Sequence, residues 1–492
     1  MPIPRALRND LQEDGSGQSQ FIESRTIRPL SGWNGASQGR IEFQLPRQGI
    51  LDRSSYIKLK VTGPLPQSRL PLWAGVYSMI ETATLRIGGT EIQTRRGFGH
   101  LSTLKTFYRT PHDRNRRQSK RSGNFSGLMV DGTTTGGTNR PGHWGVDSGQ
   151  GWADAPTVDT RNITTGYNMT NLAATTPEWV IDLATLFPIL YSNSLPLGLL
   201  DDHINIILDL SPDLVQGQRA IMDIREGAVA WVAGTTVIEP SLHVDLIFFD
   251  DPIGEVTTMD KLSEELSSGE KLVFTDDQYI TFNQPANTGA ANLPVTNKVS
   301  LGCDNQIVRS VMISSPEAIV YTNPATSGNQ LLGQYYSSAS RTENSIQLTV
   351  NNQPIYPSPV GTDSEIWNEL CQVMPTKFKM NSAIYSHFSQ VNAATGVDIG
   401  ASQRLTDKTL YGRPQTRQQG NGHYYGINLS KPGHRNVVGA GVPIGRNPVL
   451  LEITDTQMPN LEPGSFGKTY HIWVTTERLL SIVGGRVMVT GS

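Results

Sequence analysis

Cysteine, charge and long apolar runs are all scarce in this chain of 492 residues. Its two cysteines, Cys303 and Cys371, are too few for a disulfide framework, so we expect two buried thiols. Charged residues make up 17% and the formal net charge is −3, which argues against a dedicated DNA-binding protein. No run approaches the ~18 apolar residues of a membrane-spanning helix. The N-terminus lacks an apolar signal segment, so we expect a soluble protein folded in a reducing compartment.

The sequence does contain many short segments in which apolar and polar residues alternate, as in β-strands. Apolar and polar residues alternate with a period of two in residues 41–45, 57–61, 242–246 and 346–350. This period is typical of antiparallel strands with one buried and one wet face. Clusters of Gly, Pro, Asn, Ser and Thr separate the strands, and helical patterns are few and short. The pattern predicts an all-β sandwich or jelly roll.

One pattern occurs twice, about half a chain apart. Residues 85–92 form a strand, a Gly-Gly turn and a second strand, and residues 97–108 follow with helical spacing. Residues 348–355 repeat the arrangement with Asn-Asn at the turn, and residues 362–374 follow as a helix opened by a Thr-Asp-Ser-Glu capping box. A repeat of this length indicates two related domains rather than a solenoid.

Three further pairs of segments keep the same order along the chain while their offset varies. Such variation is expected when loops diverge after a duplication. The pairs are residues 57–61 with 307–313, 179–183 with 425–429, and 195–198 with 442–445.

The sequence suggests a division into an arm, two domains and a connector. We expect a mobile N-terminal arm, a first domain with a long loop insertion, a short helical connector and a second domain. The insertion is rich in Gly, Thr, Asn and Asp, and is either disordered or a functional protrusion. The respective ranges are residues 1–22, 23–251 (with 109–176 inserted), 252–270 and 271–492.

No catalytic, cofactor-binding or metal-binding pattern is present. None of the nine histidines shows the short spacing that places two ligands on one metal ion. The glycine-rich residues 439–445 lack the Lys-Ser/Thr of a phosphate loop. Adjacent carboxylates such as Asp201 and Asp202 point to opposite faces of a strand and suit acid–base catalysis poorly. We therefore expect no enzyme, no metal and no cofactor.

One basic cluster could bind a ligand. Its density suits nucleic-acid phosphate, anionic lipid or an acidic partner, whereas the alternative is a solvated loop with no ligand. Interleaved aromatic residues for base stacking are missing. The cluster consists of Arg109, Arg114, Arg116, Arg117, Lys120 and Arg121.

Four segments together resemble one family. Residues 79–92 are similar to its strand followed by Gly-Gly-x-x-Ile, and residues 41–61 to its opening hairpin. Residues 179–206 are similar to its strand, Leu-Pro-Leu and strand segment, and residues 470–485 to its closing segment. The chain resembles the double jelly-roll major capsid proteins of large eukaryotic DNA viruses and their tectivirus and adenovirus relatives.

This resemblance implies an all-β fold of two tandem eight-stranded jelly rolls with few short helices. It implies a structural subunit of the virion, made in the host cytoplasm or nucleus, whose pseudo-hexagonal homotrimers tile an icosahedral shell. Implied partners are neighbouring trimers, minor capsid and penton proteins and an internal membrane on the inner face, with no specific nucleic acid. Residues 109–176 would form an outward tower or an intersubunit clasp, and the basic cluster would contact another chain.

An alternative remains from another class of protein. Jelly rolls also serve lectins, so a carbohydrate-binding or cell-attachment β-protein of a virus fits the same fold. Lectins usually carry aromatic platforms or acidic calcium clusters, and neither is evident in the sequence.

Overall fold

The computed structural model describes the chain in segments. They are residues 19–30, 39–62, 68–69, 75–107, 121, 178–210, 222–225, 228–231, 236–251, 256–269, 271–284, 295–315, 343–373, 424–430, 441–446, 448–455 and 468–491.

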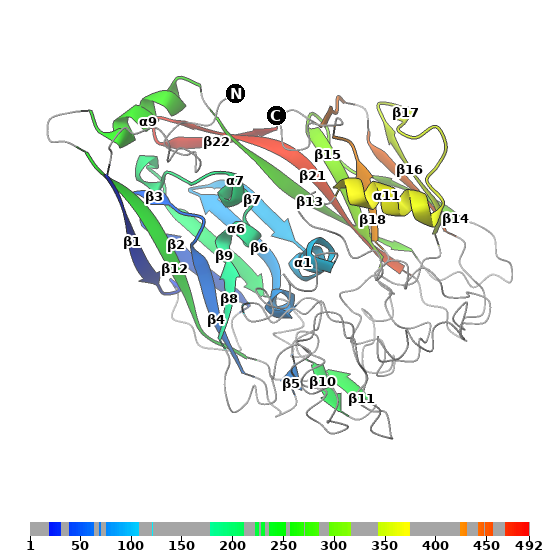
Figure 1. Ribbon diagram of the computed structural model, residues 1–492, viewed down its shortest axis with the longest axis horizontal. Helices are drawn as coiled ribbons and strands as arrows, with labels where there is room; N and C mark the ends of the chain where they lie inside the picture. The colour runs from blue at the N-terminus through cyan, green and yellow to red at the C-terminus, as the bar shows by residue number, and fades with distance from the viewer. Residues whose placement is uncertain are drawn as a thin grey trace.

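Two antiparallel sheets form the first half of the molecule, on the left in Figure 1. Sheet 1A has the strand order β1 (Ser19–Ile27), β12 (Thr236–Asp250), β4 (Tyr56–Thr62) and β8 (Glu178–Asp182), with β3 (Ile50–Leu51) also beside β12. Sheet 1B has the order β2 (Arg40–Leu45), β9 (Ile204–Leu210), β6 (Ile80–Ile87) and β7 (Thr90–Arg96).

The second half repeats this arrangement. Sheet 2A has the order β13 (Leu272–Gln284), β21 (Lys468–Val483), β15 (Ile307–Ser314) and β18 (Tyr424–Asn428), with β19 (Val442–Pro443) beside β15 and β22 (Arg486–Gly491) beside β21. Sheet 2B has the order β14 (Val295–Ser300), β20 (Leu450–Asp455), β16 (Glu343–Val350) and β17 (Gln353–Pro354).

A small third sheet and a few helices complete the described structure. The sheet consists of β5 (Ser68–Arg69), β10 (Met222–Arg225) and β11 (Ala228–Trp231). The longer helices are α1 (Phe98–Phe107), α9 (Thr258–Ser267) and α11 (Asp363–Val373). Single turns of helix are η2 (Gly75–Met79), α6 (Leu183–Leu186), α7 (Ile189–Ser192) and η4 (Leu197–Leu199).

Each half is a jelly roll, because its eight main strands form two facing four-stranded antiparallel sheets with the same strand order. The predicted repeat pairs occupy matching strands: β4 and β15, β6 and β16, β8 and β18. A matching backbone hydrogen bond lies beside the β4–β8 pair of the first half and in the β15–β18 pair of the second. It runs from Leu183 N to Ser55 O (2.9 Å) and from Leu429 N to Arg309 O (2.8 Å). The predicted duplication into two tandem jelly rolls is confirmed.

The two-residue turns of the repeated hairpin explain the matched Gly-Gly and Asn-Asn. Asn351 and Asn352 have φ angles of 51° and 62°, and Gly88 has a φ of 54°. Tight hairpin turns require such left-handed backbone, which glycine adopts freely and asparagine tolerates better than other residues. Gly-Gly and Asn-Asn therefore both allow the left-handed backbone that the turn requires.

The two helices expected after these hairpins are present as α1 and α11. The capping box of α11 forms as expected: Glu365 N donates to the Thr362 hydroxyl (3.2 Å), and Thr362 N donates to the Glu365 carboxylate (3.0 Å). Helix α9 lies within the expected connector and has its own capping box, made by Thr257 and Asp260.

The predicted arm and insertion are described only in part. Ser19–Ile22, the last residues of the predicted arm, belong to strand β1 rather than to a free arm. Residues 1–18 lie outside the described residues, and so does the insertion 109–176 apart from Arg121. The proposed division of the chain into these ranges stays a prediction.

Residues of one half complete the hydrophobic core of the other. Leu272 and Ile482, from β13 and β21, are buried in the core of the first jelly roll. Leu101 and Leu104, from α1, are buried in the core of the second. Figure 1 shows the cause, since the long strands β13 and β21 run from the right half across the top of the left half. The two jelly rolls are therefore packed as one unit.

The two cysteines differ in their environment. Cys303 is fully buried, and burial together with nearby Asp304 raises the pKa of its thiol to about 12. Cys371 is only half-buried, so the expectation of two buried thiols is wrong for this residue. It lies near the end of α11 among other half-buried residues. Both are free.

Candidate functional site: the junction between the jelly rolls

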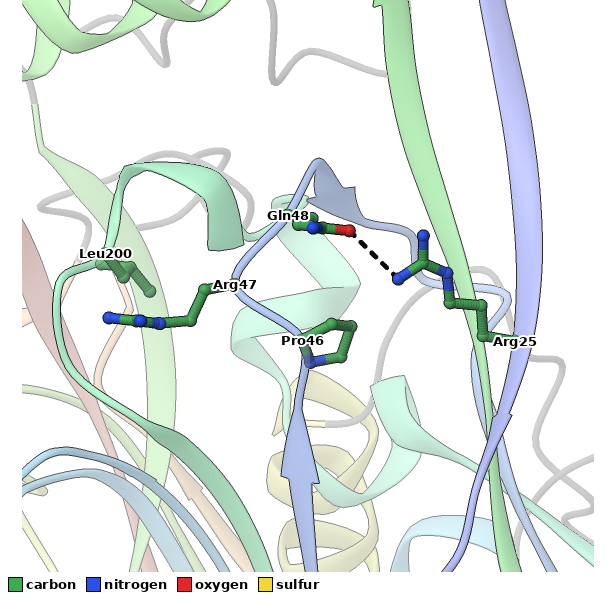
Figure 2. Close-up of a pocket in the computed structure, with 5 residues that line it drawn as sticks. All are labelled: Arg25, Pro46, Arg47, Gln48 and Leu200. Carbon is green, nitrogen blue, oxygen red and sulfur yellow. Dashed lines mark hydrogen bonds between the residues drawn. The ribbon is translucent and has the colours of Figure 1, made fainter.

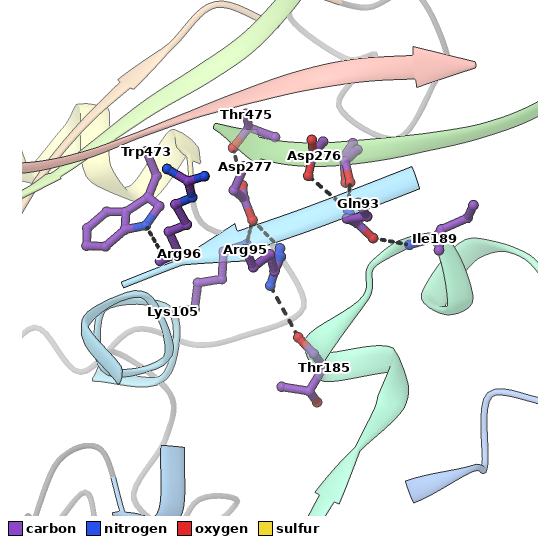
Figure 3. Close-up of polar contacts among 11 residues, drawn as sticks. Gln93, Arg95, Arg96, Lys105, Thr185, Ile189, Asp276, Asp277, Trp473 and Thr475 are labelled. Atoms are coloured by element: carbon purple, nitrogen blue, oxygen red, sulfur yellow. Dashed lines mark hydrogen bonds and ion pairs between the residues drawn. The ribbon is translucent and has the colours of Figure 1, made fainter. Parts of the chain in front are cut away.

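A buried ion pair joins β7 of the first jelly roll to β13 of the second (Figure 3). The Arg95 guanidinium donates to the Asp277 carboxylate, and the two side chains are 4% and 2% exposed. Lys105 Nζ of α1 lies 2.5 Å from the same carboxylate, and the Thr475 hydroxyl donates to its other oxygen (2.8 Å). Arg95 also donates to the carbonyl of Thr185 (3.2 Å). One carboxylate thus collects donors from three elements.

The charges in this cluster depend on one another. Burial opposes the ionisation of Asp277, but Lys105 and Arg95 outweigh it and hold the pKa of this carboxyl below its ordinary value. Removal of either partner would leave a desolvated charge without compensation. The ion pair therefore specifies how the two jelly rolls fit together.

Side-chain amides of the first jelly roll cover the free edge of β13. Gln93 donates to the carbonyl of Thr275 (3.0 Å) and to the Asp276 carboxylate (3.1 Å). Asn193 donates to the carbonyl of Val273 (2.9 Å). Both amide side chains are 1% exposed. They pair main-chain groups that an edge strand otherwise leaves open to another strand.

A stack of rings lies beside the ion pair. The imidazoles of His100 on α1 and His471 on β21 are stacked, with ring centroids 4.2 Å apart and planes 17° apart. The Tyr279 hydroxyl is 2.6 Å from Nδ1 of His471, and Trp473 donates from its indole to the carbonyl of Arg96 (3.4 Å). Burial lowers the pKa of His471 to about 3, so this imidazole is neutral in the folded protein at neutral pH.

We expect this histidine to make stability depend on pH. In the unfolded chain its pKa returns to about 6.5, so between pH 6.5 and 3 the unfolded state binds more protons and stability falls as the pH is lowered. The loss reaches at most ~1.4 kcal/mol per pH unit. Urea unfolding of wild type and His471→Gln at pH 7, 6 and 5 measures it. The wild type should lose about 2 kcal/mol more than the variant by pH 5.

The exposed His203 provides a control for this comparison. His203→Gln should retain the pH dependence of the wild type, since the buried His471 is unchanged in this variant. Equal slopes for wild type and His471→Gln would contradict the expectation.

The matching face of the first jelly roll is open. On the outer face of sheet 1A, Tyr56 stacks on His243 with centroids 4.8 Å apart, and Lys58 pairs with Glu178 at 2.6 Å. These side chains are partly or fully exposed, whereas the matching face of sheet 2A is buried under β7 and α1. Ile22 on the edge strand β1 is 63% exposed.

A shallow pocket of about 400 Å³ adjoins this edge strand (Figure 2). Arg25 of β1 and Gln48 of the β2–β3 turn face each other across it, with Arg25 donating to the Gln48 amide oxygen (3.1 Å). Arg25 also pairs with Glu23, and Arg47 donates to the carbonyl of Asp201. Both guanidinium groups that line the pocket are already engaged within the chain, so no free cation lines it among the described residues.

Of the predicted basic cluster, the structure describes only Arg121, which pairs with Asp182 at the end of β8. Arg109, Arg114, Arg116, Arg117 and Lys120 lie outside the described residues. The junction itself could not be located by sequence motif, because Arg95 and Asp277 are 182 residues apart and each sits in an ordinary strand.

The described part of the chain contains neither a metal-binding cluster nor a membrane-spanning helix. No group of three or more His, Cys, Asp or Glu side chains there is arranged to hold a metal ion. No helix there has both the length and the apolar character to cross a bilayer.

The architecture defines the chain as a double jelly roll, the fold of viral major capsid proteins. Solved structures with this fold match almost the whole chain. A chain of the PBCV-1 virus capsid matches with a TM-score of 0.52 and 12% identity, over 96% of this chain and 97% of that one. A chain of the Sputnik virophage matches with a TM-score of 0.56 and 14% identity, over 96% and 89%.

Comparisons of sequence alone find no relative. No family model matches the chain, and no curated protein matches it. At such low identities, what the structural matches share with this chain is the fold.

Proposed function

We propose that this chain is the major capsid protein of a DNA virus: a structural, non-enzymatic subunit that associates with copies of itself to build the shell of the virion. The observation that carries the proposal is the double jelly roll itself, matched over 96% of the chain by capsid chains of PBCV-1 and Sputnik. The fold class and this coverage support a role in assembly, where function resides in interfaces between subunits.

The open face of sheet 1A supports self-association. One jelly roll of the chain has its A sheet covered by its neighbour, whereas the matching sheet of the other is partly exposed and is not covered in this way by any described residue. A closed ring of alternating jelly rolls would cover every such face. Three copies supply six jelly rolls, so we infer a homotrimer with pseudo-hexagonal outline, burying a total of about 2,000 Å² or more per pair of chains.

The test is assembly of the purified protein. Light scattering at micromolar concentration should give the mass of three chains, and negative-stain images should show uniform particles of hexagonal outline. A stable monomer that forms no shell would refute the proposal, and glycan binding by such a monomer would favour the cell-attachment alternative.

The basic cluster fits a contact with another subunit or with a minor capsid protein. Six positive charges close together repel one another, so an ordered arrangement needs acidic groups nearby, and Arg121 already has one in Asp182. We expect Arg114→Ser, Arg116→Ser and Arg117→Ser together to leave the trimer folded but to impair shell assembly, the more so at high salt. Turbidity and electron microscopy of assembly reactions measure this, and normal assembly of the triple variant would contradict it.

Further partners belong to the same proposal. Minor capsid and penton proteins, and an internal membrane under the shell, are the partners we propose beyond neighbouring trimers. We also propose synthesis in the host cytoplasm or nucleus and no sequence-specific contact with nucleic acid.

A further inference from the structure

Because the two jelly rolls are related by duplication, the junction between them predicts which elements would form a second junction of the same kind. Across the junction, the second strand of the repeated hairpin in the first jelly roll, β7, contacts the edge strand β13 and the outer face of sheet 2A. The second jelly roll has the same hairpin, β16–β17, and the first has the same edge strand, β1. The chain therefore has both surfaces of a second junction, the hairpin β16–β17 and the edge strand β1, but these two do not meet within one copy.

Register identifies the residues that match on the two edge strands. Thr475 of β21 pairs with Ser310 and with Asp277, whereas His243 of β12 pairs with Tyr56 and with Thr26. Since Ser55 and Arg309 make the matching backbone hydrogen bonds in the two halves, Ser310 corresponds to Tyr56. The edge residue Asp277 thus corresponds to Thr26.

Counting back along both strands, Thr275 corresponds to Ser24 and Val273 to Ile22. Gln93 and Asn193 cover the carbonyls of Thr275 and Val273. Within the described residues, no hydrogen bond of this kind reaches the free edge of β1 at Ile22 or Ser24.

Exposed apolar side chains lie among the polar ones of this edge strand. Phe21 is 52% exposed and stacks on Phe248, with ring centroids 5.4 Å apart, and Ile22 is 63% exposed. Ile22 pairs across the strands with Ile247, and the partly buried Phe249 lies at the end of the same face. An edge strand with such neighbours is a ready surface for association.

The matching hairpin of the second jelly roll is apolar at the corresponding place. In the first jelly roll Gln93 lies opposite Leu85. In the second, Ile355 donates its N–H to the carbonyl of Leu348 and so occupies the corresponding place, with Tyr356 next to it. Both are only partly buried, and the following residues 357–359 are exposed. Within the chain the polar Gln93 and Arg95 meet the edge strand β13, whereas the remaining hairpin and edge strand present the apolar Ile355 and Ile22 at the corresponding places.

We propose that the edge strand β1, with Ile22 and the neighbouring Ile247 and Phe249 on the same face, is the docking surface for the second jelly roll of another copy of this chain, which contacts it through Ile355 and Tyr356. The proposal rests on the proposed function, since it names the surfaces by which subunits associate.

Substitution of one exposed residue tests the surface. Ile22→Asp places a carboxylate where an apolar contact is expected, and because Ile22 is exposed in the single chain the variant should fold normally. We expect a dissociation constant at least about 100-fold higher, with monomers at micromolar concentration in sedimentation velocity and an unchanged circular dichroism spectrum. Val295→Asp, at an exposed valine on β14, is the matched control and should associate as the wild type does.

Chemical crosslinking identifies the partner surface. In Ile22→Cys/Ile355→Cys, a short bismaleimide should join residue 22 of one copy to residue 355 of another, whereas neither single variant should give this product. A variant that forms trimers without this link, or Ile22→Asp that associates normally, would overturn the assigned surface and leave the proposed function standing. A wild-type chain that stays monomeric would overturn both.

Discussion

Replacement of Asp277 by alanine should destabilise the folded protein by about 3–5 kcal/mol, because it leaves Arg95 buried without its carboxylate. Lys105 is a third exposed and can turn toward solvent, but Arg95 is 4% exposed and cannot. The loss should appear as a lower midpoint of urea unfolding at pH 7.

An exposed ion pair provides the matched control. Arg40 and Asp209 lie 2.7 Å apart on the surface of sheet 1B with side chains 61% and 36% exposed, so Asp209→Ala should cost less than about 1 kcal/mol. Arg95→Met/Asp277→Leu should recover much of the stability, since neither member of the buried pair is left charged without the other. If Asp277→Ala cost no more than Asp209→Ala, the buried cluster would not stabilise the junction.

Replacement of Leu104 by alanine should destabilise the second jelly roll, although Leu104 belongs to α1 of the first. Leu104 is fully buried in the second core, and truncation of such a leucine costs about 2–5 kcal/mol. Hydrogen exchange should therefore quicken in β13 and β21, which α1 contacts through Lys105 and His100, more than in β2 or β9.

Tyr191, at 71% exposure, serves as the comparison for this prediction. Tyr191→Ala should change stability by no more than about 0.5 kcal/mol. If Leu104→Ala quickened exchange only in the first jelly roll, Leu104 would stabilise that jelly roll and not the second, contrary to the prediction.

The fold was predictable because its signals are local. Alternation in residues 57–61, the paired turns at Gly88 and Asn351 and the capping box at Thr362 each depend on a few neighbouring residues. Repetition of these local signals in the same order made the duplication visible without any contact between distant residues.

The junction was not predictable, because its signals are not local. Arg95 and Asp277 look like ordinary strand charges until two strands far apart in sequence are brought together. His471 has no local sequence pattern that indicates its burial, and the structure places it in the core. Its stacking on His100 depends on how α1 lies against β21, and the spacing of apolar residues in the sequence does not predict that packing.

The sharing of cores also bears on how the protein is made. The first jelly roll is synthesised first, yet its core includes Ile482 and Val487, near the end of the chain. At about 5–20 residues per second, tens of seconds separate the release of β12 from that of β22. During that interval the nascent first half has an unfilled apolar surface that only the last strands of the same chain can close, so molecular chaperones have a defined window in which to act.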